Sequence, residues 1–132
     1  MTQRNVLVLL SDEHHADVMG CAGHPLVKTP NLDALASRGT RFTAAYTPSP
    51  ICVPARASLA TGRYVHQHRC WDNAIAYDGT VPGWGHRLQQ AGVPVESVGK
   101  LHYRKEEDPA GFDRQHLPVH IMDGIGQVFG SV

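Results

Sequence analysis

The stretch NVLVLLS at Asn5–Ser11 indicates the fold class most directly, because it is an unbroken apolar run that includes β-branched residues. Such a run without polar alternation is typical of a strand buried on both faces, as in a parallel sheet. The sequence turns polar immediately afterwards, at Asp12-Glu13-His14-His15. In open α/β sheets, ligands bind beyond the carboxyl ends of the strands. We therefore expect a buried parallel strand followed directly by functional residues.

Helical and strand-like segments follow this run in alternation. Helices are expected at residues 30–38, 54–61 and 84–91, and short strands at residues 40–46 and 93–98. Thr29 is expected to cap the first of these helices, and a glycine follows the end of each one. Residues 63–82 have the composition of a loop, and from Arg104 onward no element is expected. The order of strands and helices predicts an α/β fold.

Composition and charge exclude several classes of protein. The 132 residues allow one domain at most, and 42% hydrophobic residues is the composition of a globular chain. Twelve Lys and Arg residues balance twelve Asp and Glu residues, so nothing favours nucleic acid or an anionic membrane as a partner. The longest apolar run, Val6–Leu10, is too short to cross a bilayer, and no secretory signal is recognisable. We therefore expect a cytoplasmic protein.

The three cysteines form neither a disulfide pattern nor a zinc pattern. Cys21, Cys52 and Cys70 are odd in number, and their spacing matches no Cys-x-x-Cys motif. A stand-alone zinc or redox protein is therefore not favoured. His66 and His68 have a spacing that can bind metal on a strand, but metal ligation is not the preferred interpretation.

The stretch SPICVPARASLATGR at Ser49–Arg63 places one cysteine at the start of an expected helix. Backbone N–H groups and the helix dipole stabilise negative charge there, which would make the Cys52 thiol reactive. Arg56, one turn further on, would add a fixed positive charge. A small buried apolar cysteine before a proline-initiated helix fits the same residues. On these residues alone, both interpretations stay open.

CVPAR at residues 52–56 resembles the C-x-P-x-R signature of type I sulfatases, and the ASLATGR that follows resembles the next segment of that family. Three further segments match in the expected order. They are the strand ending at Asp12, TPNLDALA at residues 29–36 and GKLH at residues 99–102.

The resemblance covers residues 5–102 and implies a fold. That fold is the N-terminal part of an alkaline phosphatase-like α/β sandwich, with a mostly parallel central sheet flanked by helices. WDN at residues 71–73 and HLP at residues 116–118 are most similar to the choline-sulfatase and phosphonate monoester hydrolase branch.

The resemblance also implies a sulfuric ester hydrolase that cleaves sulfate monoesters with a modified cysteine as its nucleophile. A formylglycine-generating enzyme would oxidise Cys52 to Cα-formylglycine. One hydroxyl of the aldehyde hydrate would attack sulfur, and the other would later expel sulfate. The implied site comprises Arg56 holding the hydrate, Lys100 and His102 contacting the sulfate oxygens, Asn73 as a further polar contact, and Asp12, Glu13 and Cys52 as metal ligands.

The implied metal is Ca²⁺, with Mn²⁺ or Mg²⁺ as alternatives. Glu13 stands where many sulfatases have a second Asp, which leaves its ligation open. The other family ligands are an Asp followed by His or Asn, and Asp108, Asp113 and Asp123 are not in that context. Since these cations take about six or more oxygen ligands, we interpret residues 1–132 as the N-terminal portion of a sulfatase catalytic domain, without its C-terminal half.

Two alternatives stay open at this stage. The chain also fits a phosphonate or phosphate monoester hydrolase of the same superfamily, and it fits an inactive truncated fragment without turnover of its own. Its partners would be a small sulfate or phosphonate ester and the formylglycine-generating enzyme, with no nucleic acid and no membrane. Uncovered sheet surface would favour self-association.

Overall fold

The computed structural model describes residues 4–121, and contacts divide the chain into two compact units. The first unit ends at Ala45 and the second begins at Tyr46. None of the helices between residues 4 and 121 combines the length and the apolar character needed to span a bilayer.

The first unit holds the 3-10 turn η1 (Gly20–Ala22) and helix α1 (Pro30–Arg38). Thr29 does not cap α1 through its side chain, contrary to expectation. Its hydroxyl accepts the Gly20 N–H at 2.8 Å and donates to Asp33 Oδ1 at 2.9 Å. The same Asp33 oxygen accepts the Cys21 N–H at 2.7 Å. The Thr29 and Asp33 side chains therefore join the start of α1 to η1.

Neither of the two strands expected before residue 47 forms. Residues 5–11 and 40–46 contain no strand, and the side chains of Val6 and Leu7 are 87% and 81% exposed. A strand requires a neighbour whose backbone N–H and C=O groups complete its hydrogen bonds. Among residues 4–121, neither segment pairs with such a neighbour. The prediction from apolar content is therefore wrong at these positions.

The second unit contains, within its described residues, helices α2 (Cys52–Thr61), α3 (Val65–His68) and α4 (Trp84–Gln90) and strands β1 (Glu96–Lys100) and β2 (Arg114–Val119). The helices expected at residues 54–61 and 84–91 are confirmed. Gly62 ends α2 as expected, because its φ of 66° is left-handed and its N–H reaches the Ser58 carbonyl at 2.8 Å. α3 and β2 lie where no element was expected.

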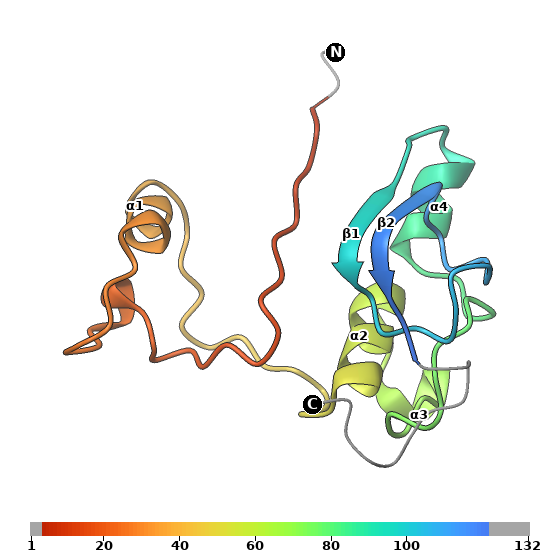
Figure 1. Ribbon diagram of the computed structural model, residues 1–132, viewed down its shortest axis with the longest axis horizontal. Helices are drawn as coiled ribbons and strands as arrows, with labels where there is room; N and C mark the ends of the chain where they lie inside the picture. Colours follow the sequence, from red (N-terminus) through yellow and green to blue (C-terminus); the bar gives the residue numbers. More distant parts are fainter. Residues whose placement is uncertain (1–3, 122–132) are drawn as a thin grey trace. The chain divides into compact units, whose positions relative to one another are not determined.

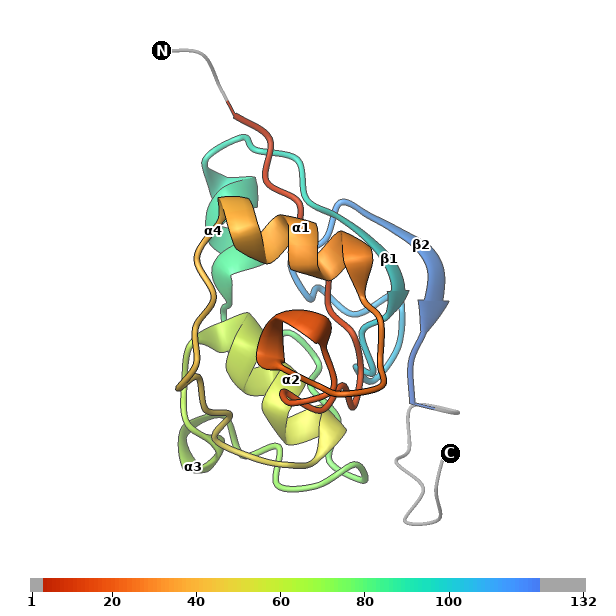
Figure 2. The same cartoon turned by 90° about the vertical axis from the view of Figure 1, so that its left-hand side faces the viewer.

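β1 and β2 form a parallel pair and lie side by side in both views (Figures 1 and 2). Pairing begins at Glu96 with Arg114. The register then shifts between Val98 and Lys100, so that Lys100 pairs with Val119. The parallel sheet confirms the α/β class. Apolar content does not predict β2, because half of its sequence RQHLPV is polar and it contains a proline.

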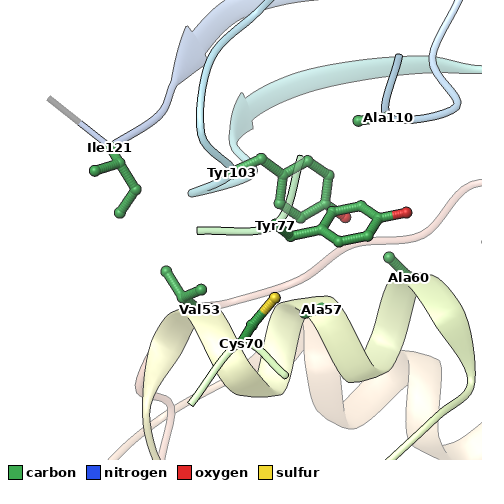
Figure 3. Packing of buried hydrophobic residues seen from close by; sticks show 8 residues of the cluster. All are labelled: Val53, Ala57, Ala60, Cys70, Tyr77, Tyr103, Ala110 and Ile121. Carbon is green, nitrogen blue, oxygen red and sulfur yellow. The ribbon is translucent and has the colours of Figure 1, made fainter. Parts of the chain in front are cut away.

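The core of the second unit lies against one face of α2 (Figure 3). Val53, Ala57 and Ala60 recur at helical spacing, and each is at most 7% exposed. Tyr77 and Tyr103 belong to the same cluster and meet edge to face, with 4.8 Å between the ring centroids. This packing fixes α2, and with it the position of the helix N-terminus.

Enlarging Ala57 should destabilise the second unit, because this side chain is 0% exposed. Ala57→Leu is expected to lower the free energy of unfolding by about 1–3 kcal/mol, the usual cost of overpacking a core. Denaturant titration followed by circular dichroism measures the change. Leu59→Ala is the matched control, because Leu59 is 55% exposed on the same helix. Equal losses in the two variants would contradict the placement of Ala57.

Candidate functional site

Cys52 is the first residue of α2 and is half-buried. Side chains satisfy the backbone donors on either side of it. The Ile51 N–H donates to Ser49 Oγ at 3.2 Å, and the Val53 N–H donates to Asn73 Oδ1 at 3.0 Å. Cys52 therefore stands at a helix N-terminus, where negative charge is stabilised. Both interpretations of Cys52 that the sequence left open fit this position.

Arg56 lies one turn into α2, with a side chain only 8% exposed. A terminal nitrogen of its guanidinium donates to the backbone carbonyl of Lys100, at the end of β1. Arg56 also acts on Tyr103. Burial and the neighbouring Tyr77 raise the pKa of the Tyr103 phenol, and the charge of Arg56 partly offsets that rise. Arg56 thus connects the helix that carries Cys52 to the end of the strand.

Lys100 and His102 follow a bulge at the carboxyl end of β1. Gly99 has a φ of 86°, which glycine adopts without strain, and the register with β2 shifts at this point. His102 also has a positive φ, 59°, and is 2% exposed. Its backbone N–H donates to the Val119 carbonyl at 2.9 Å. In the GK-x-H segment, the glycine therefore lies at a bulge near the end of the strand, and the histidine that follows is buried.

Five of the predicted site residues lie in the second unit, on segments that hydrogen bonds join directly. Asn73 is bonded to the first turn of α2, and Arg56 bonds that helix to the end of β1. The residues gathered around this junction are Cys52, Arg56, Asn73, Lys100 and His102.

Asp12 and Glu13 belong to the first unit, where they form an exposed turn after the apolar run. Glu13 has a φ of 58°, a left-handed conformation that costs a side-chain-bearing residue about 1–3 kcal/mol and is found at functional sites. Adjacent carboxylates supply the hard oxygen donors that Ca²⁺ and Mg²⁺ prefer. The donor chemistry of the turn fits a divalent metal, and ligation by Asp12 and Glu13 stays a prediction.

His68 and Ser58 form a buried pair that sequence reasoning missed. Ser58 Oγ and His68 Nε2 are 2.8 Å apart, and His68 Nδ1 accepts the Cys70 N–H at 3.1 Å. Because Nδ1 accepts, Nε2 carries the proton of the neutral ring. Burial, followed by the neighbouring His66, lowers the pKa of His68. Both ring nitrogens are engaged, which supports a structural role for His68 rather than metal ligation. No local sequence signal joins two residues ten positions apart.

Cys70 is a buried thiol, 5% exposed, in the core beside α2. Burial, followed by the charge of Asp78, raises its pKa to about 11. The group is therefore protonated at neutral pH and unreactive.

Two carboxylates that follow Lys100, those of Asp108 and Asp113, are held by structural contacts. Arg104 donates two hydrogen bonds to Asp108, at 2.6 and 2.7 Å, and these lower the pKa of the Asp108 carboxyl. Asp113 accepts the Val95 N–H at 2.6 Å. Asp123 lies outside the described residues. These bonds agree with the sequence context, which does not mark Asp108 or Asp113 as a metal ligand.

The helix that begins at Cys52 is bonded through Arg56 to Lys100 at the end of β1, with His102 two residues further on. This arrangement defines an α/β protein whose site suits an anionic group. The family model described as Sulfatase matches residues 4–119. The chain belongs to the sulfatase family, as its signature segment predicted.

Two relatives show the extent of the match. The chain is 36% identical over 109 residues to N-acetylglucosamine-6-O-sulfatase of Bacteroides thetaiotaomicron, which covers 83% of the chain and 19% of that protein. It is 34% identical over 111 residues to choline-sulfatase of Rhizobium meliloti, which covers 84% of the chain and 22% of that protein. The chain therefore spans about a fifth of the length of these relatives.

Two solved structures have a similar fold. A protein in complex with its substrate D-glucosamine-2-N,6-O-disulfate matches with a TM-score of 0.73 at 36% identity, over 79% of this chain and 21% of that one. Phosphonate monoester hydrolase of Agrobacterium radiobacter matches with a TM-score of 0.64 at 27% identity, over 80% of this chain and 23% of that one. The predicted fold class, part of an alkaline phosphatase-like α/β sandwich, is confirmed.

The lowered pKa of His68 predicts a dependence of stability on pH. Well above the unfolded value of 6.5, the ring is neutral in both states and its contribution to stability is complete. As the pH falls below 6.5, the unfolded chain takes up a proton that the folded chain resists. Stability is then lost until the pH reaches the lower folded pKa.

Denaturant unfolding between about pH 7 and about pH 5 measures this loss. We expect it in the wild-type chain and in the exposed-site control His14→Gln, and a smaller loss in His68→Gln. The same pH dependence in all three chains would contradict a buried neutral ring at His68.

Proposed function

We propose that the chain carries the nucleophile and the sulfate-contacting residues of a sulfuric ester hydrolase that acts through Cα-formylglycine at position 52. The observation that carries this proposal is the position of Cys52 at the N-terminus of α2, which Arg56 joins to the Lys100 carbonyl. Membership of the sulfatase family supports hydrolysis of sulfate esters. Because the chain spans about a fifth of its relatives' length, the activity of the whole protein is part of the proposal.

Each of the predicted site residues in the second unit has a proposed part in the reaction. Formylglycine made from Cys52 would supply a geminal diol as the nucleophile. Arg56 is oriented by its bond to the Lys100 carbonyl, and its guanidinium has five N–H donors with which to hold that diol as well. The Lys100 ammonium, the His102 ring and the Asn73 amide would donate to sulfate oxygens and stabilise the charge that develops as the S–O bond breaks.

A divalent metal, Ca²⁺ with Mn²⁺ or Mg²⁺ as alternatives, is proposed at Asp12 with Glu13 beside it. When bound, it would favour ionisation of the attacking hydroxyl. Such ions take about six oxygen ligands, and two carboxylates and one hydroxyl do not reach that number. The other ligands would come from groups other than Asp108 and Asp113, whose carboxylates hold Arg104 and the Val95 N–H.

A second candidate is a phosphonate or phosphate monoester hydrolase, which the fold similarity to phosphonate monoester hydrolase favours. The same donors would contact a tetrahedral anionic group in either reaction. The remaining alternative is a chain without turnover of its own. It is supported by the number of proposed metal ligands, which is smaller than the six or so that a divalent ion takes.

The proposed partners are a small sulfate ester and a formylglycine-generating enzyme. Self-association stays a prediction, and exposed apolar side chains on the strands support it. Val98 is 77% exposed and Leu117 is 81% exposed.

Co-expression with a formylglycine-generating enzyme should convert Cys52 to the aldehyde. Mass spectrometry of proteolytic peptides measures the conversion. Cys21 and Cys70 lack the x-Pro-x-Arg context, so their peptides are internal controls that should keep the thiol. A wild-type chain with only unmodified thiol at Cys52 under these conditions would count against the proposal.

Inorganic sulfate should bind the chain through Lys100. Because a hydrogen bond to a charged group contributes about 1.5–3 kcal/mol, Lys100→Ala is expected to raise the dissociation constant about tenfold or more. NMR titration measures this, with Lys105→Ala as the control, since Lys105 is exposed in the same unit. Equal losses in both variants would contradict a specific role for Lys100. Methylphosphonate titrated in parallel compares the two candidate substrate classes.

A further inference from the structure

The segment from His68 to Asn73 is fastened to α2 at three places. At one end, His68 Nε2 lies 2.8 Å from Ser58 Oγ in a buried contact. In the middle, the Cys70 side chain belongs to the core cluster that includes Val53. At the other end, Asn73 Oδ1 accepts the Val53 N–H at 3.0 Å. A segment that is itself fixed therefore brings Asn73 to the first turn of the helix.

The bond between Val53 and Asn73 acts directly on residue 52. The Val53 N–H and the Cys52 carbonyl belong to one planar peptide group, so holding this N–H orients Cys52 on its C-terminal side. No bond within α2 can do this, because the first N–H groups of a helix have no intrahelical partner. On the N-terminal side, Ser49 Oγ holds the Ile51 N–H.

The same bond decides what the Asn73 side chain can offer to a ligand. Its oxygen is engaged as an acceptor, so the Nδ2 group, which only donates, is the other end of the amide. A donor attracts a sulfate oxygen, whereas a carboxylate at this position would repel it. Asparagine can therefore accept from the helix with its oxygen and donate to an anion with its nitrogen. Aspartate could accept from the helix but could not donate to an anion.

We propose that Asn73 is a positioning residue whose carbonyl oxygen sets the backbone orientation of residue 52 and whose amide nitrogen is thereby presented as a donor beside the nucleophile. The role of the amide nitrogen rests on the proposed function. The role of the carbonyl oxygen depends only on its hydrogen bond with the Val53 N–H.

A side chain that merely stabilised α2 would behave differently from a positioning residue. Its removal would lower the free energy of unfolding and leave the native conformation at residue 52 unchanged. The test therefore needs a signal from residue 52 in the folded chain, measured separately from stability.

Two substitutions separate the acceptor from the donor. Asn73→Ala removes both, whereas Asn73→Asp keeps an acceptor oxygen and removes the donor. Asp72→Ala is the matched control, because the Asp72 side chain accepts the Ala74 N–H at 2.7 Å in the same segment. Three measurements are made on each unconverted chain under native conditions. They are hydrogen exchange of the Val53 amide, the Cα chemical shift of Cys52 and the affinity for inorganic sulfate.

In Asn73→Ala, the Val53 amide should exchange about tenfold faster or more, and the Cys52 Cα shift should move toward its random-coil value. Asn73→Asp and Asp72→Ala should keep wild-type values of both. Sulfate affinity should fall in both Asn73 variants and stay unchanged in Asp72→Ala. If Asn73→Ala does not fold, Asn73→Ser replaces it, because its shorter side chain also withdraws the acceptor from Val53.

Unchanged exchange and an unchanged Cys52 shift in the variant without the acceptor would overturn the proposal. Equal changes in Asn73→Asp would also overturn it, because the acceptor would then not be the atom that matters. If the exchange pattern is as expected but the wild-type chain does not bind sulfate, the positioning of residue 52 stands and the proposed function fails.

Discussion

The site in the second unit depends on the hydrogen bond from the buried Arg56 guanidinium to the Lys100 carbonyl. Burying a cation costs several kcal/mol unless acceptors surround it, on the order of the whole stability of a small domain. Arg56 is therefore held where the bulge at Gly99 interrupts the regular pairing of β1 with β2. A lysine at position 56 would offer a flexible point charge instead of a planar fork, and it could not bind this carbonyl and a second group in fixed directions.

The N-terminus of α2 is supported in the same way, by groups distant from it in sequence. Its apolar face packs into the core, Ser58 on another face bonds to His68, and Asn73 holds the first turn. A helix of this length is marginal in isolation, so its stability and the position of Cys52 come from these tertiary contacts. Residues 68–73 are fixed along α2, and their contacts hold the start of the helix, where Cys52 lies, in place.

The sequence predicts those features whose causes are local. Gly62 ends α2 because a left-handed residue is needed there, and the signature marks Cys52 and Arg56 before any contact is known. β2 was missed because its pairing with β1 decides it, and its own composition does not. The bond between Ser58 and His68 was missed for the same reason. The run at residues 5–11 shows the converse, since apolar content favours a strand but only a paired neighbour forms one.

The site proposed in the second unit would specify a reaction class more closely than a substrate. A sulfate monoester and a phosphonate monoester both present a tetrahedral centre with anionic oxygens, and the proposed donors, the Lys100 ammonium and the Asn73 amide, would bind oxygens of either. Discrimination between the two must depend on the net charge of the site and on contacts with the departing alcohol. A metal bound as proposed would contribute to that charge, so the ligands that complete its site would affect selectivity as well as rate. Arg56, Lys100 and His102 would then take part in both activities. The further metal ligands and the contacts with the departing alcohol would determine which substrate is preferred.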